Sequence, residues 1–300
     1  MHQVYSKMII DGKKTAAELR EELKKKIVEL KSTHNSIPGL TVILVGEDPA
    51  SKIYVKNKEK FAKEVGMNSE VIRYPDKVEE KVLLNKIREL NDDKKVSGIL
   101  VQLPLPKHID KRKVIEAILP NKDVDGLHPM NVGLLSSGIP RFVPATPGGI
   151  REILLRTGNN PSGKRVVILG RSNIVGRPLS NLLSMKGNGG DATVTVCHSR
   201  SKDLKQITLR ADILVAAIGI PDYVTKDMVA EGAVVVDVGI NRVEDLSRKN
   251  GYRLKGDVDF EQVFQKTSYI TPVPGGVGPM TIAMLLSNTL KAAKIGCGIV

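Results

Sequence analysis

Residues 166–178 read VVILGRSNIVGRP, an apolar strand that runs directly into a glycine turn and then into a helix. In dinucleotide-binding folds the pyrophosphate lies against free N–H groups at such a helix N-terminus. The usual GxGxxG spacing is absent, because Ser172 stands where the second glycine would be. Taken alone, the turn is therefore a weak signal, and an ordinary strand-to-helix connection explains it as well.

The next predicted strand, at residues 192–197, strengthens the dinucleotide interpretation. It ends in Cys197-His198-Ser199-Arg200, and in a Rossmann sheet the end of the second strand approaches the adenosine ribose. NAD-specific sites usually carry an acid there, whereas this chain has Ser199 and Arg200, with Arg171 across the turn. Cations and hydroxyls suit a 2′-phosphate, so we predict NADP rather than NAD as the cofactor.

Strands and helices alternate outward from this stretch in both directions. Before it, the pattern predicts helices at 15–31, from Ser51 to about Val65, at 79–91 and at 110–119, strands at 40–45, 71–74 and 98–103, and a Gly- and Pro-rich loop and linker at 121–147. Beyond its start, the pattern predicts strands at 165–169, 192–197, 213–217 and 233–238, and helices at 176–185, 203–210 and 279–294. Such alternation indicates βαβ units and mostly parallel sheets. We therefore expect an α/β protein of two domains, at residues 1–147 and 148–273, followed by a loop and helix at 274–300.

Composition narrows the class of protein. No apolar run reaches the ~18 residues of a membrane span, residues 1–14 lack the apolar core of a secretory signal, and two cysteines fit a reducing cytosol. The net charge is +13, but basic residues are interleaved with acidic ones. Four Phe, six Tyr and no Trp leave little for stacking on nucleic-acid bases. The charge is best explained as a solvated basic surface, from which a polyphosphate cofactor or a polycarboxylate substrate would also benefit. We expect a cytoplasmic protein, with nucleic-acid binding as the remote alternative.

Four polar residues in the first half of the chain are candidates for chemistry. Tyr54 and Lys58 are four apart and share a helix face, in a helix that begins after the carboxyl end of a strand, where α/β sheets bind ligands. Gln102 follows the apolar run 99–101, and a buried Gln needs a hydrogen-bond partner. Asp125 lies in Asp-Val-Asp-Gly, a sequence that also suits a simple turn. Each of them has an ordinary structural explanation when it is taken singly.

Taken in order, these motifs resemble the methylenetetrahydrofolate dehydrogenase/cyclohydrolase family, from about residue 8 to 294. The resemblance is carried by Tyr54-xxx-Lys58, VQLPLP at 101–106, DVDG at 123–126, GRS at 170–172 and PVPGGVGPMT at 272–281. It implies oxidation of 5,10-methylenetetrahydrofolate by NADP, followed by hydrolysis of the methenyl product to 10-formyltetrahydrofolate. It also implies a catalytic first domain, a Rossmann second domain, a C-terminal helix that returns to the first domain, and a homodimer formed through the Rossmann domains.

The resemblance also implies roles for single residues. Lys58 matches the catalytic lysine, Tyr54 the tyrosine that stacks on substrate, and Gln102 the glutamine that tunes the lysine. Asp125 matches the carboxylate that anchors the amino edge of the pterin. The substrate contacts implied are Tyr54, Lys58, Val101, Gln102, Leu103, Asp125, Pro274, Gly275, Gly276, Val277, Gly278, Pro279, Met280, Thr281 and Ile282. The nucleotide contacts implied are Gly170, Arg171, Ser172, Ser199, Arg200 and Ile240.

Some features lie outside this pattern. Residues 186–191 make a loop slightly longer than is usual for the family, which we expect to be a surface turn, and residues 295–300 extend past the predicted last helix without an assigned role. His128 has no second ligand at metal spacing, so we expect no metal site. Cys197 is predicted to pack in the sheet. The nearest functional alternative is a monofunctional dehydrogenase, and the pairing of Lys58 with Gln102 favours the bifunctional enzyme. We expect folate substrates with anionic, polyglutamylated tails.

Overall fold

The stretch 166–178 enters a six-stranded parallel sheet of the order β1-β11-β8-β7-β5-β6. The computed structural model describes residues 8–248 and 251–299. The strands of this sheet are β1 (Met8–Ile9), β5 (Arg165–Leu169), β6 (Thr193–Cys197), β7 (Ile213–Ala216), β8 (Val234–Asp237) and β11 (Tyr269–Ile270). The central strands β5, β7 and β8 are almost continuous Val, Ile and Leu, as expected for strands that are covered on both faces.

The chain divides into two compact units. Unit 1 comprises residues 8–16 and 146–281, and unit 2 comprises residues 17–145 and 282–299. Besides its sheet, unit 1 contains α6 (Ala145–Arg156, which begins one residue before the division), α7 (Gly176–Ser184), α8 (Leu204–Thr208), the 3-10 turn Lys226–Met228, α9 (Phe260–Phe264), and an antiparallel hairpin of β9 (Asn241–Glu244) and β10 (Tyr252–Lys255).

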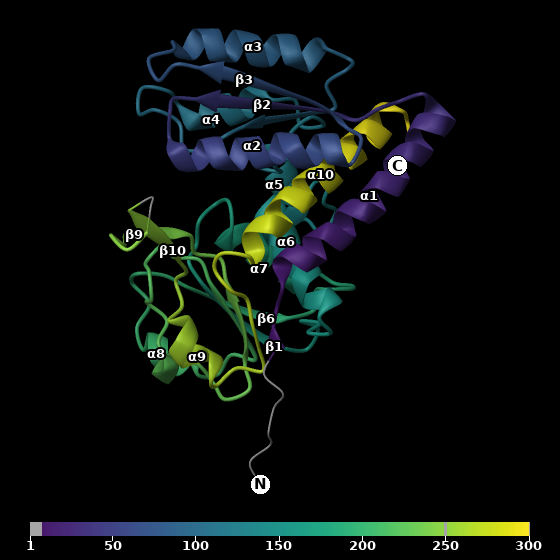
Figure 1. Ribbon diagram of the computed structural model, residues 1–300. Helices are drawn as coiled ribbons and strands as arrows, with labels where there is room; N and C mark the ends of the chain where they lie inside the picture. The colour runs from purple at the N-terminus through teal and green to yellow at the C-terminus, as the bar shows by residue number, and fades with distance from the viewer. Residues whose placement is uncertain (1–7, 249–250, 300) are drawn as a thin grey trace. The chain divides into compact units, whose positions relative to one another are not determined.

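Unit 2 is a second α/β structure, with a smaller sheet. Its parallel sheet has the order β3-β2-β4 and consists of β2 (Gly39–Val45), β3 (Asn68–Tyr74) and β4 (Gly98–Val101). Its helices include α2 (Pro49–Glu64), α3 (Glu80–Asp92), α4 (Lys111–Ala117) and α5 (Pro129–Ser136). Figure 1 shows α2 and α3 on opposite sides of β2 and β3. Ile43 and Ile99 of the sheet pack in one apolar cluster with Leu83 and Ile87 of α3.

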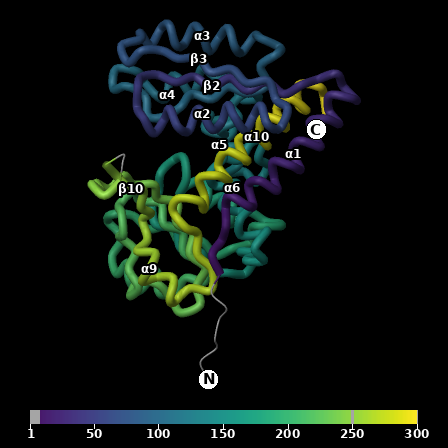
Figure 2. Tube along the Cα trace, in the orientation of Figure 1, coloured from purple at the N-terminus to yellow at the C-terminus, as the bar shows by residue number. Residues whose placement is uncertain are grey.

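Two long helices contribute residues to both units. α1 (Gly12–His34) passes from unit 1 into unit 2 near residue 17, and α10 (Val277–Gly296) does so near residue 282. Figure 2 shows α10, in yellow, as one unbroken helix. Within unit 2 the Asn288 side chain of α10 donates hydrogen bonds to the carbonyls of Val124 and Val143, each at 2.8 Å. The expected return of the C-terminal helix to the first domain is therefore confirmed.

The structure corrects several details of the sequence-based prediction. Residues 121–147 are not simply loop, because they include α5 and the start of α6. The strand predicted at 98–103 ends at Val101, and Asp48, rather than Ser51, caps α2. Residues 8–16 group with unit 1, because β1 pairs with β11. The last helix extends to Gly296, and of the terminal segment 295–300 only Val300 lies outside the described residues.

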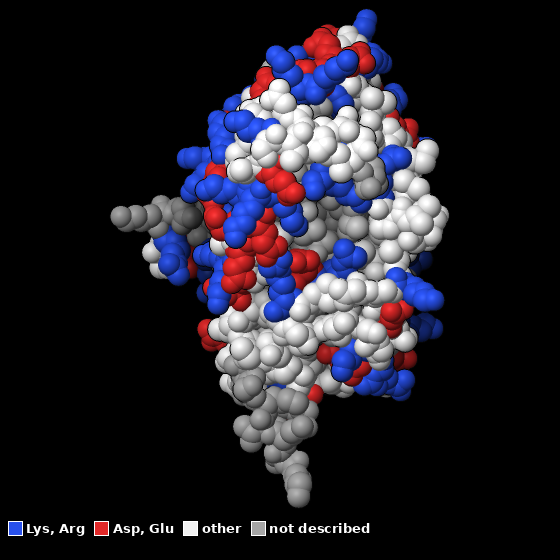
Figure 3. All heavy atoms as spheres, turned by 90° about the vertical axis from the view of Figure 1, so that its right-hand side faces the viewer, with Lys and Arg blue, Asp and Glu red and all other residues white. Residues whose placement is uncertain are grey.

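The surface carries intermixed charges. On the face in Figure 3, lysine and arginine side chains lie among aspartate and glutamate side chains. Ion pairs such as Arg20–Glu64 at 3.4 Å and Lys63–Glu59 at 2.6 Å illustrate this mixing. Among the described residues, no helix is long and apolar enough to cross a membrane.

Candidate functional site

Helix α2 carries the first two candidate residues, and its N-terminus is set by its own sequence. The Asp48 carboxylate accepts a hydrogen bond from the Ser51 N–H at 2.7 Å, and Pro49 occupies the first turn, where its missing N–H is no loss. Four residues apart on this helix, Tyr54 is half-buried and Lys58 is only 8% exposed. The two side chains are therefore held on the helix side that faces the protein rather than solvent.

Lys58 and Gln102 meet although 44 residues separate them in the chain. The Lys58 Nζ donates to Gln102 Oε1 at 2.9 Å. Gln102 Nε2 donates to the Leu103 carbonyl at 2.7 Å, and the Gln102 backbone N–H donates to the Ile43 carbonyl at 2.8 Å. Both ends of the Gln102 amide are thus engaged, and its oxygen is directed at the ammonium group. The predicted pairing of these two residues is present in unit 2.

Asp125 belongs to the same electrostatic environment. Burial lowers the pKa of the Lys58 amine, and the negative charge of Asp125 partly opposes that shift. Burial raises the pKa of Asp125, while Lys58 acts in the opposite direction. Val101, Leu103 and Asp125 line one small cavity of about 20 Å³, room for about one water molecule. Lys58 is thus hydrogen-bonded to Gln102 and lies within electrostatic range of Asp125.

Asp123, for which no separate role was predicted, holds the turn that carries Asp125. Asp123 is 2% exposed, and its Oδ2 accepts hydrogen bonds from the His128 N–H and from Asn131 Nδ2, each at 2.8 Å. Gly126 follows with a φ of +70°, in the left-handed region that favours glycine. The sequence signal for Asp123 is the presence of two acids in Asp-Val-Asp-Gly. If one carboxylate binds the substrate, the other is available to hold the turn.

The glycine turn of unit 1 is packed too tightly for any other residue. Gly170 has a φ of +113°, and a Cβ there would lie 2.2 Å from the Ala217 carbonyl oxygen; a Cβ on Gly176 would lie 2.0 Å from the Gly170 carbonyl oxygen. Ser172 Oγ accepts a hydrogen bond from the Val175 N–H at 3.2 Å. This close turn leads into α7 at the carboxyl end of β5, the geometry that receives a pyrophosphate.

The end of β6 suits a phosphate rather than a ribose hydroxyl. Arg171, Ser199 and Arg200 are exposed, and among the described residues neither arginine forms an ion pair. The turn after β6 is shaped by His198, whose N–H donates to Ser201 Oγ at 2.9 Å and whose Nδ1 accepts from the Arg200 N–H at 3.2 Å. The residues present therefore fit a cofactor with an additional anionic group. Ile240, which follows β8, is 43% exposed.

The segment predicted to contact substrate, residues 274–282, leads into α10. Residues 274–281 are grouped with unit 1, whereas Lys58, Gln102 and Asp125 are in unit 2. Gly275 has a φ of +116°, and a Cβ on Gly12 would lie 1.8 Å from the Gly276 carbonyl oxygen. Thr281 Oγ1 lies 3.0 Å from Thr146 Oγ1. The segment is thus fixed against the start of α1 and against α6.

Two other features of the sequence can be placed. Gly189 and Gly190 of the long loop are buried, and a Cβ on Gly189 would meet Arg151 and Leu155 of α6 at 2.9 Å. Part of the loop therefore packs against α6 and is not simply a surface turn. Within residues 8–248 and 251–299, no group of three or more His, Cys, Asp or Glu side chains is arranged to hold a metal ion. Cys197 is a free, buried thiol, as predicted.

Both halves of the chain match domains of one known family. Residues 10–125 match the catalytic domain of tetrahydrofolate dehydrogenase/cyclohydrolase, and residues 144–297 match the NAD(P)-binding domain of the same family. The chain is 59% identical over 287 residues to the bifunctional protein FolD of Pelagibacter ubique, covering 96% of this chain and 98% of that protein.

Two crystal structures share the fold over nearly the whole chain. The bifunctional FolD of Campylobacter jejuni superposes with a TM-score of 0.89 at 50% identity, covering 96% of this chain and 99% of that one. The FolD of Trypanosoma brucei, in complex with NADP and an inhibitor, superposes with a TM-score of 0.91 at 41% identity, covering 96% and 97%.

Proposed function

The chain belongs to the tetrahydrofolate dehydrogenase/cyclohydrolase family, and we propose that Lys58, Gln102 and Asp125 form the centre at which its folate substrate reacts. The protein is a bifunctional enzyme: it oxidises 5,10-methylenetetrahydrofolate to the methenyl form with NADP and hydrolyses that product to 10-formyltetrahydrofolate. The observation that carries the assignment of the centre is the 2.9 Å bond from the buried Lys58 Nζ to Gln102 Oε1.

The dehydrogenase step requires mainly alignment from the protein. NADP, when bound, supplies the hydride acceptor. The methenyl product is a resonance-stabilised cation, so holding the reactants in register is the main contribution that side chains can make. The aromatic ring of Tyr54, half-buried on α2, offers a flat face for the substrate ring. The carboxylate of Asp125 accepts hydrogen bonds from the amino edge of the pterin and fixes its orientation.

The cyclohydrolase step requires proton transfer, which we assign to Lys58. A water molecule adds to the methenyl carbon and passes one proton to the neutral Nζ, which becomes ammonium. That proton then goes to the ring nitrogen as its bond to the same carbon breaks. The hydroxyl group on the carbon loses the second proton of the original water to solvent as it becomes the formyl oxygen, so that 10-formyltetrahydrofolate is released, one proton is given up and Lys58 is neutral again. Burial favours the neutral amine by lowering its pKa, and Gln102 Oε1 holds the amine in place in both protonation states.

For the cofactor we propose the open ends of β5 and β6. Gly170, Arg171 and Ser172 would hold the pyrophosphate region, and Ser199 and Arg200 would hold the 2′-phosphate. The absence of a Cβ at Gly170 and the exposed arginines support this placement. Ile240 would contact the dinucleotide from the end of β8. The segment 274–282 would contact the folate, and exposed basic residues would attract its polyglutamate tail.

The assembly and cellular location are also proposals. We propose a homodimer formed through the edge strand β6, which has one side of its backbone open in the described sheet. We propose a cytoplasmic location, supported by two cysteines that are both free thiols.

Two assays on the purified protein test the function. With methylenetetrahydrofolate, we expect reduced-nicotinamide absorbance to appear with NADP and more weakly with NAD. With methenyltetrahydrofolate alone, we expect hydrolysis without any nucleotide. Activity in the first assay without activity in the second would support the monofunctional dehydrogenase instead.

A further inference from the structure

Unit 1 contains two buried carboxylates that neither reaction uses. Asp237, the last residue of β8, is 3% exposed, and Asp257, which follows β10, is 0% exposed. A buried carboxylate is unfavourable unless hydrogen bonds replace its lost hydration. Each of the two carboxylates accepts three such hydrogen bonds, so both belong to one specific hydrogen-bond network.

Asp257 joins segments that follow two different strands. Its Oδ2 accepts hydrogen bonds from the backbone N–H groups of Ile218 at 2.7 Å and Gly219 at 2.9 Å, just beyond β7. Its Oδ1 accepts from Asn241 Nδ2 at 2.9 Å, beyond β8. One side chain therefore sets the relative positions of the connections that follow β7 and β8.

Asp237 fixes Asp257 in turn. Asp237 Oδ1 accepts from the N–H of Asp257 at 2.9 Å and of Gly239 at 3.0 Å, and its Oδ2 accepts from the Val258 N–H at 3.0 Å. The Asp237 N–H donates to Thr271 Oγ1 at 2.7 Å. The backbone on both sides of Asp257 is thus anchored to the end of β8.

Two glycines make these approaches possible. A Cβ on Gly239 would lie 2.1 Å from Asp257 Oδ1, and a Cβ on Gly256 would lie 1.8 Å from Asp237 Oδ2. Both distances are far below van der Waals contact, so any side chain at either position would displace a carboxylate. The network therefore requires the absence of a side chain at Gly239 and Gly256 as well as the two carboxylates.

The network lies at the carboxyl ends of the parallel strands, where the glycine turn after β5 also lies. The Ala217 N–H donates to the Leu169 carbonyl at 2.8 Å, and Ala217 is the residue that a Cβ on Gly170 would strike. Ile218 and Gly219 follow Ala217 directly. Dinucleotides bind outside the carboxyl ends of such parallel strands. The exposed side chains of Ile220 and Ile240, at 49% and 43% exposure, project from the two connections that Asp257 joins.

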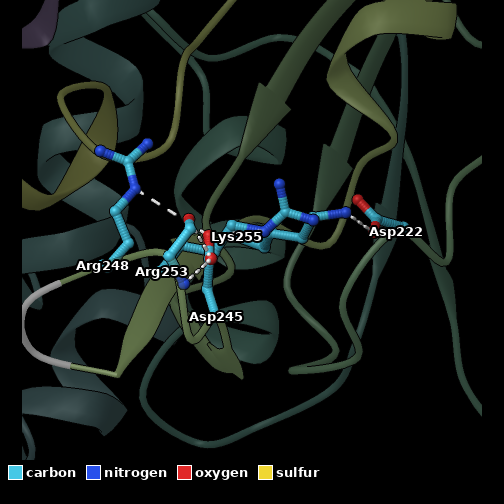
Figure 4. Close-up of polar contacts among 6 residues, drawn as sticks. Asp222, Asp245, Arg248, Arg253 and Lys255 are labelled. Carbon is cyan, nitrogen blue, oxygen red and sulfur yellow. Dashed lines mark hydrogen bonds and ion pairs between the residues drawn. The ribbon is translucent and has the colours of Figure 1, made fainter.

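The neighbouring hairpin contains a different set of charges, shown in Figure 4. Asp245 pairs with Arg248 and Arg253, each at 3.9 Å, so its ion pairs stay within the hairpin and its connecting turn. Lys255 pairs with Asp222 of the connection after β7. Asp245 is therefore a suitable control, because it is an acid of the same region whose ion-pair partners among the described residues, Arg248 and Arg253, belong to neither connection.

We propose that Asp257, held in place by Asp237, is a positioning residue for NADP. It keeps the backbone at Ile218–Gly219 and the segment at Ile240 in the arrangement that receives the dinucleotide. The proposal rests on the placement of the cofactor beside Gly170 that is proposed above. Asp257 itself does not contact the reacting atoms.

Asp257→Asn tests the proposal by binding rather than by activity. The amide keeps one oxygen for the two backbone N–H groups, and its new NH₂ either opposes Asn241 Nδ2 or forces the Asn241 amide to turn its oxygen inward. In both cases the charge of the acceptor is lost. Removing one hydrogen bond to a charged group lowers a binding constant by about 10-fold or more. We expect the Kd for NADP, measured by titration calorimetry with NADP alone, to rise about 10-fold.

A rescue separates positioning from general damage. In Asp257→Asn/Asn241→Asp the new carboxylate accepts from the new amide, and the amide oxygen still accepts from Ile218 and Gly219. We expect the Kd of this double variant to return to within about 3-fold of the wild type. The matched control Asp245→Asn should bind NADP with the wild-type affinity. In kinetics the KM for NADP should rise in Asp257→Asn, with kcat at saturating NADP largely retained.

An unchanged Kd in Asp257→Asn would overturn the proposal, and so would a raised Kd that the double variant fails to restore. If Asp257→Asn does not fold, Asn241→Ala replaces it, since it removes only the half-exposed partner; a several-fold rise in its Kd supports the proposal and an unchanged Kd overturns it. Wild-type protein that binds no NADP would instead contradict the proposed cofactor site itself.

Discussion

Lys58 is buried and forms no ion pair within the part of the chain that the structure describes, which is an uncommon situation for a lysine. The side-chain amine meets the Gln102 amide oxygen, whereas Lys52 and Lys63 of the same helix pair with glutamates at the surface. A neutral partner in a desolvated region leaves the amine free to lose its proton at lower pH than an exposed lysine would. This is the property that a proton-transferring group needs.

Lys58→Met should abolish the cyclohydrolase activity while the fold is retained, because the apolar stem is kept and only the amine is lost. General acid–base groups contribute about 10²- to 10⁴-fold in rate, so we expect a loss of at least about 100-fold in hydrolysis of methenyltetrahydrofolate. The matched control is Lys56→Met, at an exposed position on the same helix. Wild-type hydrolysis by the Lys58 variant would show that another group moves the proton.

Asp237 should make the stability of the protein depend on pH. Burial raises its pKa to about 7, the nearby Asp257 carboxylate adds to the rise, and backbone N–H donors oppose it. The folded protein therefore binds a proton that the unfolded chain has released above pH 3.8. The stabilisation is fully present below that pH and is lost as the pH rises through 7, by at most about 4 kcal/mol.

Urea unfolding between pH 4 and 8 measures this effect. In Asp237→Asn the amide does not titrate, so we expect a flatter dependence of the unfolding free energy on pH, whatever its absolute value. Equal slopes in the two proteins would show that Asp237 is ionised throughout this range.

At the scale of elements, the choice of cofactor depends on the turns after β5 and β6. These turns present Arg171, Ser199 and Arg200 to solvent. The turns themselves are held by backbone and side-chain bonds that do not involve the guanidinium groups. The arginines can therefore be removed without disturbing the scaffold that carries them.

Arg171→Ala/Arg200→Ala should raise the KM for NADP and leave the KM for NAD nearly unchanged. Charged hydrogen bonds contribute roughly 1.5–3 kcal/mol each, so the loss of one should cost at least ~10-fold. Steady-state kinetics with each nucleotide at saturating folate measure this, with Arg210→Ala, an exposed arginine that follows α8, as control. An equal loss for both nucleotides would place the arginines on the shared pyrophosphate.

At the scale of the whole molecule, the main sheet has β6 as one edge, with a row of backbone groups that no strand pairs within the described residues. Edge strands of this kind either are protected or pair with another chain. The other edge strand, β1, is only two residues long, so β6 offers the longer surface for pairing.

Light scattering after size-exclusion chromatography should therefore give about twice the chain mass of 32.7 kDa. Thr195→Lys, which places a charge on the exposed edge, should reduce the dimer fraction, whereas Thr33→Lys at the exposed end of α1 should not. A wild-type mass of one chain at micromolar concentration would contradict the proposed dimer.

The sequence was a sufficient guide wherever local pattern and packing agree. β5 forms at the predicted residues 165–169 because a buried parallel strand is a continuous apolar run. It was a poor guide to the start of α6, because Ala145 to Pro147 lie in the Gly- and Pro-rich stretch 121–147 that was predicted as loop and linker. A Cβ on Gly149 would lie 3.0 Å from Met280 Cβ, so α6 packs closely against α10 at this residue, and this tertiary packing offsets the low helix propensity of glycine.

By itself the sequence determined the alternating α/β architecture, the glycine turn and the placing of Tyr54 and Lys58 on one helix face, because these depend on neighbours only a few residues away. Only the tertiary structure decided that Lys58 meets Gln102, that Asp123 holds the turn of Asp125, and that Asp257 ties together the connections after β7 and β8. Those contacts join residues brought together by strand order and helix packing. The hydrophobic periodicity of a sequence does not indicate which distant polar atoms will meet in the interior of the fold.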